Sequence, residues 1–134
     1  MRALFLILAD AAQVVEGKLY MLGGGWNTVF VDALPASRGS NIAIGLEVAS
    51  DEVEVRHSFR LTLLSPGEEA EPEIGRGEFE VGRPPETPGG TEQRLIAAFP
   101  IVLQLGQQGR FIVRFYVDGT EMGQAAFGVV HRPQ

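Results

Sequence analysis

The side chains that could perform nucleophilic or acid–base chemistry are few in this chain and far apart. It has two histidines, His57 and His131, five serines and no cysteine. A serine hydrolase needs a serine, a histidine and a carboxylate close together, often with a Gly-x-Ser-x-Gly turn, and that turn is absent here. Without cysteine there is neither a thiolate nucleophile nor a thiolate metal ligand. We therefore expect no catalytic residue.

Metal binding has equally little support from the spacing of possible ligands. Neither histidine has a second histidine or a carboxylate two residues away, on the same face of a strand. The acidic runs at 51–54 and 68–73 lack the pattern of a calcium loop and are typical of solvated turns. His57 alternates with Phe59 and Leu61, which favours a hydrogen-bonded, half-buried histidine at a strand end. We expect no metal and no cofactor.

Binding of a glycan or another small molecule has one candidate site, an aromatic pair. Trp26 is the only tryptophan and follows three consecutive glycines, and Tyr20 lies in the apolar segment before them. Their rings could offer a flat surface to a sugar or a peptide, but a tryptophan in the core or at an interface is the favoured interpretation. Glycines inside a strand indicate a β-bulge or a close backbone approach.

These side chains must be positioned by strands, because apolar residues recur with a period of two along most of the chain. In 110–118, Phe111, Val113, Phe115 and Val117 alternate with their neighbours, and Asp118-Gly119 is typical of a two-residue hairpin turn. The predicted strands lie near 3–9, 18–31, 41–49, 55–64, 74–81, 94–103, 110–118 and 121–130. Glycines divide the second, and any helix would be a short turn at 10–15 or lie in the proline-rich loop. We predict a single all-β domain over 1–134, a two-layer antiparallel β-sandwich of immunoglobulin-like or C2-like form with about eight strands.

Composition and length restrict the function and the compartment. The 134 residues suffice for one domain with a real core, and the net charge of -6 disfavours nucleic-acid binding, which requires Lys and Arg on phosphates. The apolar segment 3–9 resembles a short signal peptide, but Asp10 follows at once, so a buried first strand is favoured. No segment approaches the ~20 apolar residues of a membrane span. We expect a cytoplasmic protein that contacts no membrane.

One predicted strand has two apolar faces. In 94–103, Ile96, Ala98, Pro100 and Val102 lie opposite Leu95, Ala97, Phe99 and Ile101, and there is no charged residue between Leu95 and Leu103. An apolar second face needs a cover, and Pro100 is typical of an edge or bulged strand.

These features predict a non-enzymatic interaction or structural module. We expect it to form a homodimer, or to bind another protein, through Ile96, Ala98, Pro100 and Val102; the loop at 82–92 could instead cover this face within one chain. A small-molecule or glycan-binding module that uses Trp26 is the alternative, and a hydrolase comes third.

Two stretches of the chain resemble a known family. The opening pattern is Ala9-Asp10-Ala11-Ala12, then Gly17-Lys18-Leu19 and Gly23-Gly24-Gly25-Trp26, and the closing pattern runs from Gly109-Arg110-Phe111 through Asp118-Gly119 to Phe127-Gly128-Val129. Together they are similar to a family of small uncharacterised bacterial proteins, catalogued as a domain of unknown function. The resemblance implies an all-β domain from a bacterium and supplies no activity, ligand or catalytic residue.

Overall fold

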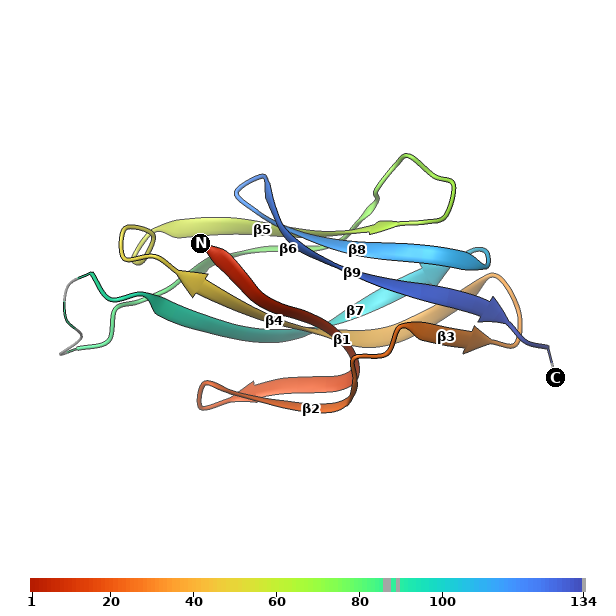
Figure 1. Ribbon diagram of the computed structural model, residues 1–134, viewed down its shortest axis with the longest axis horizontal. Coiled ribbons are helices and arrows are strands. Elements are labelled where there is room, and N and C mark those ends of the chain that lie inside the picture. Colours follow the sequence, from red (N-terminus) through yellow and green to blue (C-terminus); the bar gives the residue numbers. More distant parts are fainter. Residues whose placement is uncertain (86–87, 89, 134) are drawn as a thin grey trace.

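The computed structural model describes all residues except 86–87, 89 and 134, and its regular elements are nine β-strands (Figure 1). The strands are β1 (Arg2–Val15), β2 (Lys18–Gly24), β3 (Thr28–Val31), β4 (Ala36–Val48), β5 (Arg56–Leu64), β6 (Glu73–Glu80), β7 (Gln93–Leu105), β8 (Gly109–Val117) and β9 (Thr120–His131). None of the described residues forms a helix long and apolar enough to cross a membrane.

The strands form two sheets that pack against each other. Sheet A has four strands in the order β2-β1-β4-β7, and sheet B has five in the order β3-β9-β8-β5-β6. The prediction of an all-β fold with two packed sheets is therefore confirmed. It is wrong in one respect, because β3 pairs with β9 in parallel, so the sandwich is not purely antiparallel.

Three strand boundaries differ from the predicted ones. The segment 10–15, expected to be a loop or a short helical turn, continues β1 and pairs with β2. The predicted strand 18–31 is two strands in different sheets, since Gly23 (φ 61°) and Gly25 (φ 83°) turn the chain out of β2. These glycines end a strand rather than form a bulge within one. The fourth strand begins at Ala36, five residues before its predicted start.

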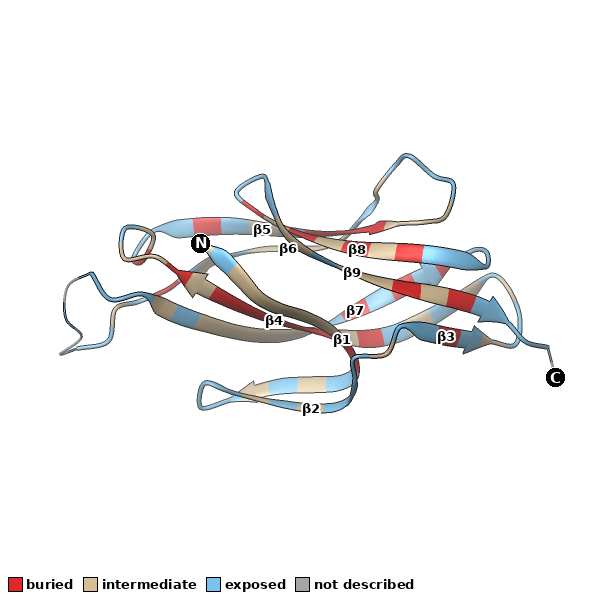
Figure 2. Cartoon of the chain, viewed as in Figure 1, coloured by how far each residue is buried: buried red, intermediate tan, exposed pale blue. Residues whose placement is uncertain are grey.

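The core lies between the sheets and follows the predicted alternation. Figure 2 shows buried residues along β4, β8 and β9. The alternating set of β8 is fully confirmed: Phe111, Val113, Phe115 and Val117 are all buried. Thr62 alternates with the core residues Leu61 and Leu63 and is nevertheless buried, because the segment after β5 folds back and Glu71 accepts a hydrogen bond from its hydroxyl at 3.0 Å. The predicted hairpin turn at Asp118-Gly119 is also confirmed, with φ of 50° and 82°.

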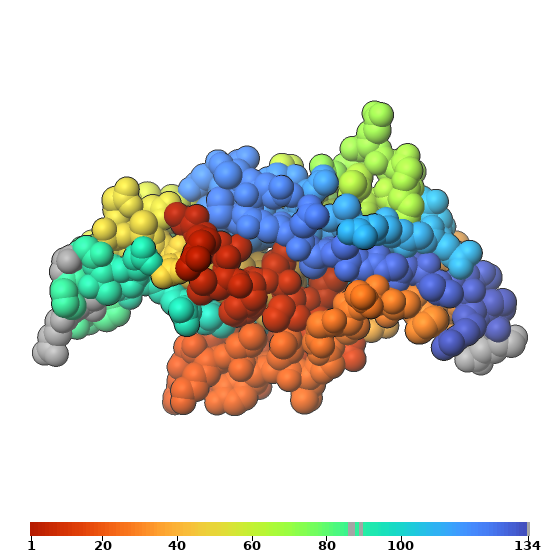
Figure 3. All heavy atoms as spheres, viewed as in Figure 1, coloured from red at the N-terminus to blue at the C-terminus, as the bar shows by residue number. Residues whose placement is uncertain are grey.

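Strand β1 belongs to two parts of the molecule. Up to Ala9 it pairs with β4 inside sheet A, and from Ala11 onward it pairs with β2. Residues 10–24 thus form a two-stranded arm, which Figure 1 shows on the side of sheet A that faces away from sheet B. Some residues of β2 also approach β7. The space-filling view shows the arm, in orange, protruding from the lower side of the body (Figure 3).

Candidate functional site

The outer face of sheet A, which points away from sheet B, is largely apolar. Strand β7 is the edge of this sheet, as Pro100 predicts, and pairs with β4 along its whole length. Its outward residues are Ile96, Ala98, Pro100 and Val102, because the alternate residues Ile101, Leu103 and Leu105 are buried between the sheets. Val102 is 53% exposed, Pro100 is exposed, and Ile96 and Ala98 are half-buried.

Strands β1 and β4 continue this apolar face away from the edge. Phe5 is directly opposite Gly45, and its ring lies where a side chain at Gly45 would be. Ile7 is opposite Ala43, which in turn is opposite Ala98 of β7. The four predicted interface residues are therefore one side of an apolar face that crosses three strands and is fully buried at Ala43.

The arm adds exposed apolar side chains next to this surface, and of these the sequence identified only Tyr20, as half of an aromatic pair. Leu22 is 75% exposed, Tyr20 52% and Val15 45%. Leu22 is opposite Ala11 and Tyr20 is opposite Gln13 across the β1–β2 ladder, so these side chains share one face of the arm. The sequence signal was present in the Glu16-Gly17 turn between two apolar segments, whose residues have φ of 52° and 73°.

The predicted aromatic pair is divided between two environments. Tyr20 lies on the arm, whereas Trp26 is half-buried and packs edge-on against Phe127, with ring centroids 5.8 Å apart. The guanidinium of Arg38 lies 5.0 Å from the centroid of the Trp26 ring and also binds the carboxylate of Asp10 at 2.9 Å. Arg38 thus links the carboxylate of Asp10 to the face of the Trp26 ring. A sugar at Trp26 would have to compete with Arg38 for the ring face, and the ligand-binding role stays a prediction.

His57 is buried and uses both ring nitrogens, which confirms a hydrogen-bonded histidine at a strand end. Nδ1 lies 2.7 Å from the Asp118 carboxylate, and Nε2 lies 2.8 Å from the backbone carbonyl oxygen of Glu52. A carbonyl and a carboxylate only accept hydrogen bonds, so both nitrogens carry protons in this arrangement. Accordingly the pKa of His57 is raised, first by the Glu52 carbonyl and then by Asp118, and the pKa of Asp118 is lowered, chiefly by His57.

Ser58 completes a serine, histidine and carboxylate cluster, but not in the order that hydrolysis requires. Its hydroxyl lies 3.5 Å from Asp118 Oδ1, and its backbone N–H donates to the same oxygen at 2.9 Å. A general base must accept the serine proton, and here both nitrogens of His57 are occupied by other acceptors. This geometry positions a turn and provides no activated nucleophile.

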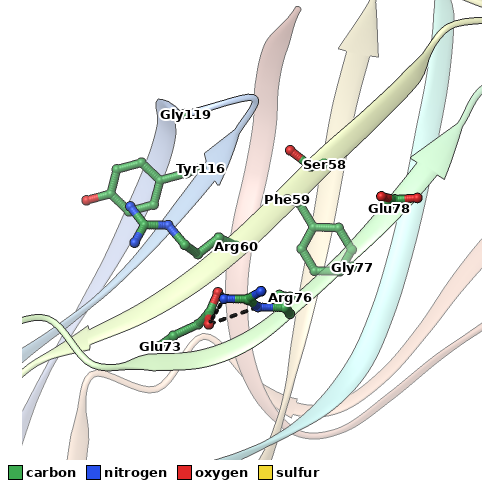
Figure 4. Close-up of a pocket in the computed structure, with 9 residues that line it drawn as sticks. All are labelled: Ser58, Phe59, Arg60, Glu73, Arg76, Gly77, Glu78, Tyr116 and Gly119. Atoms are coloured by element: carbon green, nitrogen blue, oxygen red, sulfur yellow. Dashed lines mark hydrogen bonds and ion pairs between the residues drawn. The ribbon is translucent and has the colours of Figure 1, made fainter.

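A shallow hollow of about 340 Å³ lies on sheet B between the outward side chains of β5 and β6 and the β8–β9 turn (Figure 4). Arg60 lies over the Tyr116 ring at 4.6 Å, and Arg76 binds Glu73 at 2.6 Å. Figure 4 shows Arg60 and Arg76 side by side, in agreement with their pairing across β5 and β6. The Arg76–Glu73 ion pair is partly exposed, and pairs of this kind contribute little stability. Among the described residues, no three His, Asp or Glu side chains gather as a metal site would require.

Comparison with solved structures finds distant likenesses. The alkylpurine DNA glycosylase AlkC from Pseudomonas fluorescens, bound to DNA containing an abasic site analog, has a TM-score of 0.49 and 13% identity, over 78% of this chain and 27% of that chain. Superoxide reductase (neelaredoxin) from Ignicoccus hospitalis has a TM-score of 0.42 and 14% identity, over 79% of this chain and 75% of that chain. Neither likeness carries an argument about function.

No curated protein matches the chain. A family does, as the opening and closing patterns led us to expect. The match extends over residues 4–130, so the chain belongs to the family described as "Family of unknown function (DUF6941)".

Proposed function

We propose that this protein is a non-enzymatic interaction module that acts through the outer face of sheet A, and that its first partner is a second copy of itself. The observation that carries the proposal is the exposed apolar edge of this face at Pro100 and Val102, on a strand without charge from Leu95 to Leu103. An exposed apolar edge strand tends to pair with other chains and to aggregate unless another surface covers it.

The described part of the chain does not cover this edge. Val102 remains 53% exposed, although β2 approaches β7 from the same side. The loop at 82–92 was the alternative cover, and its residues 86, 87 and 89 lie outside the described residues. A two-fold dimer would cover the edge by placing two identical faces together, the commonest closed arrangement, and about 800 Å² per partner is enough for a specific contact.

The arm supports the same proposal. Two-stranded hairpins are marginally stable in water by themselves. This one carries Leu22 and Tyr20 in the open, on the face that continues from Ala9 and Ile7. Packing of the arm against a second copy would bury these side chains, and it would extend the contact beyond the four residues of β7.

We expect Val102→Glu to convert a wild-type dimer into a monomer, because a carboxylate in an apolar contact is strongly unfavourable. The measurement is light scattering coupled to size exclusion, at a protein concentration of about 10–100 µM. Val130→Glu is the matched control: Val130 is 39% exposed, but it lies on β9 in the other sheet, so this variant should remain dimeric.

Circular dichroism of both variants tests whether the fold survives. A monomeric wild-type protein would overturn the dimer, and a dimer that persists in Val102→Glu would place the contact elsewhere. Loss of β structure in Val102→Glu alone would mean that Val102 belongs to the core.

A further inference from the structure

A separate apolar cavity of about 120 Å³ lies between the two sheets, beside β6 and β7, which are edge strands of different sheets. Its eight lining residues come from both sheets and all are apolar. Four are phenylalanines, each from a different strand: Phe59 from β5, Phe79 from β6, Phe99 from β7 and Phe115 from β8. Leu95 and Ala97 of β7 line it as well.

Phe59 is at the centre of this cluster. Its ring centroid lies 5.4 Å from that of Phe99 across the sheets, 6.1 Å from Phe115 and 6.4 Å from Phe79. The rings are tilted by 38° to 45° and not stacked flat. These separations are ordinary for packed aromatic rings, and the cavity lies beside the cluster, with all four rings in its lining.

The cavity has a closed floor and an open mouth. Phe115 at the floor is 3% exposed, whereas Phe59, Phe79 and Phe99 are half-buried. β6 and β7 are the edges of their sheets and approach each other at few points, so the mouth lies between them. His57 packs against the Phe79 ring, with ring centroids 5.4 Å apart, and does not line the cavity.

We propose that this cavity is a binding site for a small hydrocarbon group, such as one aromatic ring. Water would find no hydrogen-bond partner among the lining side chains, and an apolar cavity of roughly 150 Å³ is known to remain dry and to bind benzene. With no polar group in its wall, the site selects its ligand by size and hydrophobicity. Any polar group of the ligand has to remain at the mouth between β6 and β7.

Benzene is the probe for the test, and nuclear magnetic resonance of isotope-labelled protein is the measurement. We expect saturable one-to-one binding, with the largest shifts at the Ala97 methyl group and the four phenylalanine rings. Ala97→Phe supplies a ring of its own to the cavity and should weaken benzene binding by about tenfold or more.

Ala126→Phe is the matched control. Ala126 is also half-buried, but it lies on β9 between Phe127, which is buried, and Ala125, which packs against the core, so it points out of sheet B and binding should not change. Shifts that rise linearly up to the solubility of benzene, or that map to Val102 and the arm, would overturn the site. Unchanged affinity in Ala97→Phe would do the same. If that variant does not fold, the wild-type titration decides alone.

Discussion

Phe127→Ala is expected to lower the free energy of unfolding by about 3–5 kcal/mol. Phe127 is 2% exposed, and its ring stacks on Phe111 with centroids 5.5 Å apart and planes 13° apart. The Phe127 ring also packs edge-to-face with the Trp26 ring, with centroids 5.8 Å apart. Truncation removes both contacts and leaves a cavity next to β3 and β8, which flank β9 in sheet B. Chemical denaturation monitored by circular dichroism measures the loss.

The same variant reports on Trp26. In the wild-type protein, packing against Phe127 should keep the emission of Trp26 blue-shifted, and in Phe127→Ala the emission should move to the red. Phe30→Ala is the matched control, since Phe30 is 52% exposed on the neighbouring β3 and its removal should cost less than about 1 kcal/mol. If Phe127→Ala lost little stability and left the emission of Trp26 unchanged, the packing of Phe127 against Phe111 and Trp26 would be contradicted.

Raising the pH above 6.5 is expected to destabilise the protein through His57. The pKa of this histidine is raised in the folded state, by the Glu52 carbonyl and then by Asp118. The stabilisation that such a group contributes is fully present below its ordinary pKa of about 6.5. It is lost as the pH rises through the higher pKa that the group has in the folded protein. The pKa of Asp118 is lowered, so its contribution is complete above about 3.9 and is lost as the pH falls through the lower folded value. The pair therefore stabilises the fold most between about pH 4 and 6.5.

Denaturant titrations at several pH values measure this dependence. Asp118→Asn should weaken it, because asparagine tolerates the φ of 50° at this turn but carries no charge for His57. His57→Ala should cost about 1–3 kcal/mol at pH 6, since it leaves Asp118 without its main partner. His131→Gln is the control, because His131 is exposed and its ring nitrogen Nε2 lies 3.0 Å from a backbone carbonyl oxygen, that of Asp32. A free energy of unfolding that does not change from pH 6 to 9 would mean that His57 is neutral in the folded protein.

Local alternation predicted most of the fold, and pairing between remote segments decided the rest. The buried positions from Phe111 to Val117 were predicted correctly because the residues on the buried face of a strand are apolar and alternate with those on the other face. The parallel pair of Thr28–Val31 with Gly128–His131 joins segments about a hundred residues apart, and no local pattern contains that choice. The continuation of β1 beyond Ala9 was hidden because Asp10 and two alanines do not look like a strand until β2 lies beside them.

Of the two candidate sites, the sequence could likewise predict one and not the other. Ile96 to Val102 could be assigned to an outer face because Ile101 and Leu103, their alternate neighbours, are plainly core residues. The cavity around Phe59 could not be predicted, since its phenylalanines come from four strands and meet only through the packing of the two sheets. The ion pair between Arg38 and Asp10 could not be predicted for a related reason, because Arg38 lies in a part of β4 that was expected to be loop.

The two halves of β1 should differ in hydrogen exchange. Its first half ends at Leu8 and Ala9, which are both buried, whereas from Ala11 onward its ladder among the described residues is with β2. Backbone amides protected by few buried contacts open at low free-energy cost. Protection measured by amide exchange should therefore fall sharply after Ala9, within one continuous strand. We therefore expect residues 10–24 to open and close locally while the sandwich stays folded.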